Sequence, residues 1–179
     1  MTRIHHLNCG SHCLLVELES KLVLVDTGMG LRDVRTPRAR LSPLFLHGSR
    51  RPRLHEEDTA VRQITTLGFH AADVTDIALT HLDCDHAGGL DDFPNARVHL
   101  LEAERDAAIA QRTFLDRQRF RPQQWSTFPR WQTYAADGER WFGFPGVREL
   151  DGLPPEILLV PLVGHTLGHA GVAIRREEE

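Results

Sequence analysis

Short apolar runs alternate with polar segments along the chain, and most of these runs have the length and composition of β-strands. Residues 13–18 and 22–25 are rich in Leu and Val, and the polar residues 19–21 separate them, so they predict a β-hairpin at the edge of a sheet. Three further apolar runs predict strands of the same kind, at 76–80, 97–101 and 158–163.

Helical patterns lie between these strands. Ala60, Val61, Ile64 and Leu67 recur at the spacing of one helix face, with acidic residues just before them and a glycine just after. A second helix is predicted at 102–111. The order of helices and strands favours a layered α/β sandwich. Residues 31–55 are rich in Arg, Pro and His without a clear period, so we expect an irregular loop that covers the site.

Residues 112–146 form an aromatic-rich segment. Nine of the twelve aromatic residues lie between Phe114 and Phe144, and neither a period of 2 nor one of 3.6 organises them. We expect an insertion that packs its own small core; the alternative is an apolar wall of a substrate pocket or a dimer contact. Five arginines lie among the aromatics and are expected to be solvated surface, with anionic-substrate binding as the alternative: Arg117, Arg119, Arg121, Arg130 and Arg140.

The composition is that of an ordinary globular protein. With 179 residues, 41% of them hydrophobic, the chain has enough apolar material for one domain over 1–179. A net charge of -4 argues against a nucleic-acid partner. No apolar run approaches membrane-spanning length, and the first residues lack the apolar core of a signal peptide, so we expect no membrane partner and a cytoplasmic location. The three cysteines predict no disulfide framework, and Cys84 is expected to pack.

The segment 80–90 carries the most distinctive chemistry. It places two imidazoles and two carboxylates within six residues: His81, Asp83, Asp85 and His86. So much polarity after a buried strand needs a metal or water. Residues 81 and 83 lie on one side of an extended chain and can face one ion, whereas 85 and 86 point towards a second. The alternative is a solvated loop with a helix N-cap at position 85.

A second signal lies downstream. The apolar run 158–163 ends in Gly164-His165-Thr166-Leu167-Gly168-His169. Open α/β sheets place ligands and active groups at the carboxyl ends of their strands, which is where this segment falls. Asp26 follows the run 22–25 in the same manner, either as a turn residue before Thr27-Gly28 or as a carboxylate that orients the metal loop.

In this order, residues 24–28, 80–90 and 164–169 resemble the motifs of the metallo-β-lactamase fold superfamily of metallohydrolases, and the lactonase-like and glyoxalase II-like branch most. The resemblance covers about residues 10 to 175. It implies an αββα sandwich and a metal-dependent hydrolase that directs metal-bound hydroxide at an ester, lactone or thioester carbonyl of a small-molecule substrate. Zn²⁺ is the expected ion, with one or two ions per chain.

The resemblance also implies a role for each motif residue. It assigns five metal ligands, His81, Asp83 and His165 to a first ion and Asp85 and His86 to a second. Asp85 would also orient the attacking water and is the expected catalytic residue. Asp26 and His169 would support the metal loops without binding an ion. No residue is assigned to substrate binding.

Two departures from the family pattern modify this expectation. The family usually has His where this chain has Asp83, and a carboxylate favours Fe or Mn without excluding Zn. A di-iron oxidoreductase of the same superfamily is therefore an alternative. The family also continues with a bridging Asp and a last His, so we expect this chain to be the N-terminal two-thirds of a metallohydrolase and its αββα sandwich to be incomplete. An inactive truncated fragment is the third alternative, and a homodimer would cover the exposed sheet edge.

Overall fold

The computed structural model describes residues 2–48, 52–126 and 130–175. Its main sheet has six strands in the order of the sequence, and the first three pair antiparallel whereas the last four run parallel. The strands are β1 (Arg3–Asn8), β2 (His12–Glu17), β3 (Leu22–Val25), β4 (Val74–Ala78), β5 (Arg97–Leu101) and β6 (Trp131–Tyr134). Connections of helical length separate the parallel strands, as parallel pairing requires.

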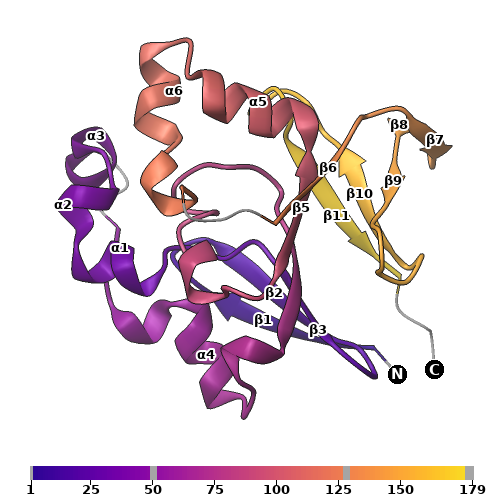
Figure 1. The fold of residues 1–179 in the computed structure, drawn as a ribbon, viewed down its shortest axis with the longest axis horizontal. Coiled ribbons are helices and arrows are strands. Elements are labelled where there is room, and N and C mark those ends of the chain that lie inside the picture. The colour runs from indigo at the N-terminus through magenta and orange to yellow at the C-terminus, as the bar shows by residue number, and fades with distance from the viewer. Residues whose placement is uncertain (1, 49–51, 127–129, 176–179) are drawn as a thin grey trace.

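A second, antiparallel sheet lies beside the first (Figure 1). It has the order β11-β10-β9, with β9 (Arg148–Glu149), β10 (Ile157–Pro161) and β11 (Ala170–Ile174). A separate two-stranded ribbon joins β7 (Gly138–Trp141) to β8 (Phe144–Gly146).

Helices cover the face of the main sheet that points away from the second sheet (Figure 1). They are α1 (Leu31–Arg35), α2 (Pro37–Arg40), α3 (Pro43–His47), α4 (Ala60–Thr66), α5 (Glu102–Ala110) and α6 (Phe114–Arg119). Four short 3-10 turns lie in the connections between these helices and strands, at Glu56–Asp58, Ala71–Asp73, Leu90–Asp92 and Pro122–Gln124. Among the described residues the layers are therefore helices, six-stranded sheet and three-stranded sheet.

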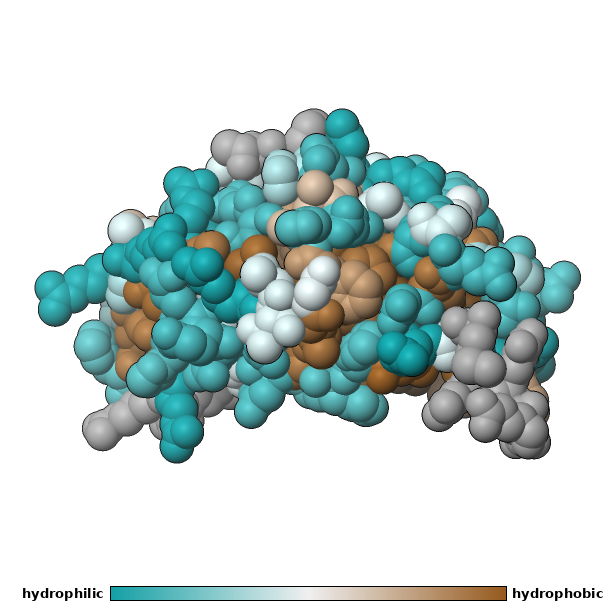
Figure 2. Space-filling model, turned by 90° about the horizontal axis from the view of Figure 1, so that it is seen from below, coloured by the Kyte–Doolittle hydropathy of each residue, from teal (hydrophilic) through white to brown (hydrophobic). Residues whose placement is uncertain are grey.

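Two apolar cores hold these layers together. The larger one lies between helices and main sheet and includes Leu24, Ile64, Ile77 and Phe93, all fully buried. The second joins the two sheets and contains residues of both, such as Val23 and Leu159. This architecture confirms the predicted mixed α/β sandwich. Viewed from below, hydrophobic surface also runs through the middle of the molecule between hydrophilic flanks (Figure 2).

The placement of the first hairpin and the nature of residues 31–55 differ from the prediction. β2 and β3 do form a hairpin, but β1 pairs outside β2, so the hairpin is not at the sheet edge. The sequence analysis did not predict β1, because its sequence, RIHHLN, has no apolar alternation. Leu7 is its one buried residue. Residues 31–47 form three short helices instead of a loop. Proline begins α2 and α3, and the Ser42 side chain accepts a hydrogen bond from the Phe45 N–H.

The expectation of a separate aromatic core in the segment 112–146 is wrong. Phe120 and Trp125 belong to the main core, and Tyr134 packs between the two sheets. β6 continues the main sheet by parallel pairing with β5. The absence of a simple period has a physical reason, because the aromatics of this segment are divided between the two cores and the surface, where Phe114, Phe142 and Phe144 are exposed. Phe128 lies outside the described residues.

None of the helices in the described ranges is long and apolar enough to cross a bilayer.

A buried carboxyl group beside α1 makes the stability of the fold depend on pH. Burial, with added repulsion from Asp33 and Asp91, raises the pKa of Asp92 to about 6. The folded state therefore retains a proton that the unfolded chain releases near pH 4, so stability is lost as the pH rises from about 4 through 6. Asp92→Asn keeps an acceptor for the Leu31 N–H, which Asp92 Oδ2 binds at 2.9 Å.

We expect this variant to raise the free energy of unfolding by about 1 kcal/mol at pH 8 and to leave it unchanged at pH 4. Urea unfolding at both pH values measures the difference. Asp91→Asn is the matched contrast and should destabilise, because Asp91 pairs with Arg32 at 3.0 Å and Arg40 at 2.7 Å. Equal stability of Asp92→Asn and the parent at pH 8 would show that the Asp92 carboxylate is well solvated.

Candidate metal centre

The motif residues gather at the carboxyl ends of the parallel strands. Asp26 follows β3 directly, and His81 comes three residues after the end of β4, which pairs with β3. The loop between β10 and β11 contributes His165 from the second sheet. A hydrogen bond from the Ala170 N–H to the Thr80 carbonyl, 2.9 Å long, joins the two sheets at this point. The sandwich thus brings together segments that lie about 80 residues apart in the chain.

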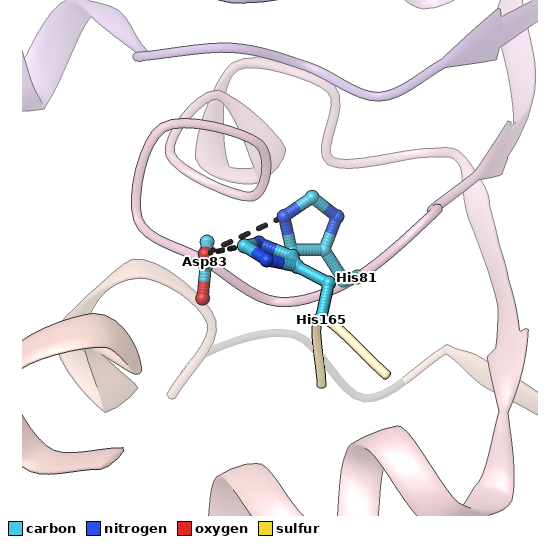
Figure 3. A group of neighbouring side chains, drawn as sticks. All are labelled: His81, Asp83 and His165. Atoms are coloured by element: carbon cyan, nitrogen blue, oxygen red, sulfur yellow. Dashed lines mark hydrogen bonds and ion pairs between the residues drawn. The ribbon is translucent and has the colours of Figure 1, made fainter. Parts of the chain in front are cut away.

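Three side chains form a compact group of metal-type donors (Figure 3). One donor atom from each of His81, Asp83 and His165 lies within 4.8 Å of the others. Asp83 Oδ2 is 3.5 Å from His81 Nε2 and 3.1 Å from His165 Nε2. Both imidazoles turn towards this carboxylate (Figure 3). Within residues 2–48, 52–126 and 130–175, no other such set of three donors is found.

A chain of hydrogen bonds fixes the tautomer of His81. Thr80 Oγ1 donates to Asp26 Oδ2 at 2.7 Å, so it has no proton left for His81 Nδ1, 2.8 Å away. His81 Nδ1–H therefore donates to Thr80, and Nε2 keeps a free lone pair. His81 is 4% exposed, and its buried Nε2 has no hydrogen-bond partner among the described residues.

This donor set fits a divalent metal. A buried nitrogen lone pair without a partner is costly unless something binds it. Two imidazoles and one carboxylate are a known protein donor set for zinc, and the carboxylate also suits iron and manganese. The contacts of Asp26 and Thr80 behind His81 are of the type that orients metal-binding imidazoles.

The other motif residues lie around this group without completing a second set of three donors in the described part of the chain. The ring of His86 lies 4.0 Å from that of His81, and its Nδ1 is 2.8 Å from Asp26 Oδ2. Asp85 is buried and lines two hollows of the surface, one of them beside Asp83. His169 donates from Nδ1 to the Leu162 carbonyl at 2.9 Å, and its ring is 5.1 Å from that of His81.

The charges of the site shift three pKa values. Burial opposes ionisation of Asp83, but the nearby His81 imidazole and the hydrogen bonds from Arg119 outweigh it and hold the pKa of this carboxyl below its usual range. Burial and the nearby Arg119 charge lower the pKa of His165, which favours the neutral imidazole that metal binding requires. Burial disfavours the charged form of His86, yet the hydrogen bond to Asp26 raises its pKa overall.

Two residues touch both metal loops, which are residues 80–90 and 162–169, and the sequence analysis assigned neither of them to the site. Glu104, fully buried on α5, accepts the Leu82 N–H at 2.9 Å and the Gly168 N–H at 3.1 Å. The sequence feature that could have indicated Glu104 is its position in the first turn of α5, a helix that directly follows a strand. Arg119, expected to be solvated surface, instead binds Asp83 and His165. No local pattern marks it, since Asp83 is 36 residues away.

Two hollows open on either side of Arg119 and His165, which line both. The first has a volume of about 360 Å³ and includes Asp83 and Asp85 in its wall. Its apolar lining comes from Leu44, Phe45 and Leu115, on α3 and α6. The second hollow, of about 530 Å³, lies between α5, the start of α6 and the loop at 163–167. Volumes of this size accommodate small molecules.

Histidine and cysteine residues away from these loops serve packing and surface contacts. His99 is fully buried, and both of its ring nitrogens have partners, Asp76 at 3.0 Å and the Tyr134 hydroxyl at 2.7 Å. His6 and His12 stack on each other at the surface. Burial raises the pKa of the Cys84 thiol, and Cys84 packs with Met29 and Leu41 as expected.

An α/β sandwich with a His–Asp–His donor set at its strand ends defines a protein with a candidate metal centre, and comparison with known proteins identifies its family. The family model described as the metallo-beta-lactamase superfamily matches residues 7–179. A probable metallo-hydrolase of Mycobacterium tuberculosis is 43% identical over 182 residues, which cover 96% of this chain and 58% of the relative. An N-acyl homoserine lactonase of Bacillus thuringiensis is 32% identical over 109 residues, 61% of this chain and 43% of that protein.

Solved structures agree with this comparison. An N-acyl homoserine lactone hydrolase, with its product N-hexanoyl-L-homoserine bound at the catalytic metal centre, superposes with a TM-score of 0.69 at 26% identity, covering 91% of this chain and 57% of the other. A probable metal-dependent hydrolase from Staphylococcus aureus shares the fold, with a TM-score of 0.72 at 17% identity over 98% of this chain and 69% of the other. This chain belongs to the metallo-beta-lactamase superfamily. It spans 58% of the length of its mycobacterial relative.

Proposed function

We propose that this chain carries the first metal site of a metal-dependent hydrolase that cleaves an ester, lactone or thioester carbonyl in a small molecule. The observation that carries the proposal is the unpartnered, buried His81 Nε2, aimed at the same place as Asp83 Oδ2 and His165 Nε2. The names of the relatives, metallo-hydrolase and N-acyl homoserine lactonase, support this reaction class.

His81, Asp83 and His165 would hold the ion, with Zn²⁺ as the proposed metal. A divalent ion held there would supply Lewis-acid activation of water and of the substrate carbonyl. The hydrogen bonds from His81 through Thr80 to Asp26 keep His81 in the tautomer that offers Nε2. Neutral His165 and ionised Asp83 are the protonation states that the pKa shifts favour.

Asp85 is the proposed proton carrier. Its side chain lines the hollow of about 360 Å³ beside Asp83. Its carboxylate would take a proton from the attacking water as the new bond to the carbonyl carbon forms. The same proton would then go to the leaving oxygen or sulfur as the old bond breaks, giving a carboxylic acid and an alcohol or thiol. Leu44 and Leu115 would contact the apolar part of the substrate. Asp85 and His86 would belong to a second ion if one binds.

Metal analysis combined with hydrolysis assays tests the proposal. We expect about one equivalent of Zn²⁺ per chain and hydrolysis of at least one of three probes: an N-acyl homoserine lactone, a p-nitrophenyl ester and an acyl thioester. Two equivalents would place a second ion on Asp85 and His86. Iron with a visible absorption band and no hydrolysis would favour the oxidoreductase alternative. A folded protein that binds no metal and cleaves no probe would show an inactive fragment.

A further inference from the structure

The guanidinium of Arg119 contacts the same atoms that the candidate metal centre offers to an ion. Its Nε and Nη2 donate to Asp83 Oδ1 and Oδ2, both at 2.8 Å. Nη2 also lies 2.8 Å from His165 Nε2, and Nη1 donates to the His165 carbonyl at 3.0 Å. Two of the three donor atoms of the metal group are thus bound by one side chain. The third, His81 Nε2, has no partner among the described residues.

The backbone holds Arg119 at this position. α6 ends at Arg119, and its carbonyl accepts the Cys84 N–H at 3.1 Å. Phe120, which follows, forms an antiparallel bridge with Asp83 and is buried in the main core. The side chain of Arg119 is 31% exposed, so the fold confines it between the two metal loops. Its contacts are therefore built into the fold.

The chemistry of these atoms allows either the guanidinium or an ion, but not both in the same arrangement. A neutral imidazole has one lone pair at its unprotonated nitrogen, and His165 Nε2 uses it when it accepts from Arg119 Nη2. An ion bound to His165 Nε2 therefore displaces Nη2. The contacts of Nε with Asp83 Oδ1 and of Nη1 with the His165 carbonyl use other atoms and can persist.

We infer that Arg119 is a built-in competitor of the divalent cation at the His81–Asp83–His165 group. The inference rests on the proposed metal site and concerns how strongly this site binds its ion. Arg119 neutralises Asp83, whose side chain is only 13% exposed, so the ligand loops keep their arrangement without a dication. The cost is weaker ion binding, because a dication must approach a fixed positive charge and release one of its hydrogen bonds.

Replacing Arg119 should therefore strengthen ion binding. Arg119→Gln removes both the competing donor and the charge repulsion, and it leaves the Asp83 charge available to the ion. After allowance for solvent screening at a partly exposed side chain, we expect Arg119→Gln to bind Co²⁺ about tenfold more tightly than the parent. Arg119→Lys keeps the positive charge but lacks the planar guanidinium, so its Co²⁺ affinity should lie between those of the parent and Arg119→Gln.

Titration of purified, chelator-treated protein with Co²⁺, followed by visible absorption and by calorimetry, measures these affinities. The matched control is Arg117→Gln, which removes an exposed arginine of the same helix and should bind Co²⁺ as the parent does. Ion-free Arg119→Gln should also unfold at a lower temperature than the parent, because Asp83 loses its partner. Co²⁺ should then raise its unfolding temperature by more than it raises that of the parent.

The outcomes separate this inference from the proposed function. If the parent binds Co²⁺ and Arg119→Gln binds it equally or more weakly, Arg119 is not a competitor, and the metal site itself stands. Binding by Arg119→Gln alone supports the inference in its strongest form. If neither protein binds Co²⁺, both the inference and the proposed metal site are overturned.

Discussion

Replacement of His81 by alanine is expected to abolish metal binding at the His–Asp–His group and, with it, hydrolysis. His81 is the donor with the strongest structural requirement for a ligand, because its buried Nε2 has no other partner in the described chain. Lewis-acid activation contributes several kcal/mol to such reactions, so we expect activity to fall by about 10³-fold or more. Metal content should fall from about one equivalent to near zero.

Elemental analysis and the hydrolysis assay on the same preparation measure both effects. His70→Ala is the matched control. His70 is exposed in the turn before β4, so its replacement should change neither metal content nor hydrolysis. Thr80→Val adds a graded variant, because it keeps His81 but removes the hydroxyl that sets its tautomer. It should retain the fold and lose about 10- to 100-fold in metal affinity. Unchanged metal content in His81→Ala would refute the assignment of the first site.

The second large effect is expected at Glu104, which no local pattern connected with the site. Its two carboxylate oxygens accept the Leu82 and Gly168 N–H groups, one from each metal loop. In Glu104→Gln one of these N–H groups faces an amide N–H instead of an acceptor. An unsatisfied buried donor costs about 1 to 3 kcal/mol, so we expect a loss of about that size in the free energy of unfolding. Metal affinity should fall by about 10- to 100-fold as the loops separate.

Urea unfolding with and without the ion distinguishes the two contributions. The control is Glu102→Gln, because Glu102 lies on the same helix but is 52% exposed, and within the described part of the chain its side chain pairs with Arg105 alone. The backbones of Gly168 and Glu104 also lie close together, so a Cβ at Gly168 would collide with the Glu104 backbone. We therefore expect Gly168→Ala to weaken metal binding in the same direction. Parent-like affinity in Glu104→Gln would show that the loops hold their spacing without it.

The chain order of its apolar runs was sufficient to predict most of the fold. β3, β5, α4 and α5 lie within two or three residues of their predicted positions, because hydrophobic periodicity and turn residues are local properties. The elements that were not predicted have sequences in which polar and apolar residues follow no regular period. β1 buries only one side chain, and α1 to α3 are too short for a helical period to emerge.

Within the site, the sequence by itself determined which donors are available and that they follow strands. His81 and Asp83 are two residues apart, and His165 follows the apolar run 158–163. The types and spacing of these residues can therefore be taken directly from the sequence. The family resemblance followed from the same motifs. Which donors share one place was decided by the tertiary structure, which groups His81, Asp83 and His165 and leaves Asp85 outside that set.

Only the tertiary structure also decided what surrounds these donors. Glu104 clamps both loops, and Arg119 binds Asp83 across 36 residues. The orientation of His81 depends on Asp26, which is brought next to Thr80 by the parallel pairing of β3 and β4. The physical reason is that local pattern reports burial and backbone preference, whereas the partner of a polar side chain depends on which elements the packing of the two cores brings face to face.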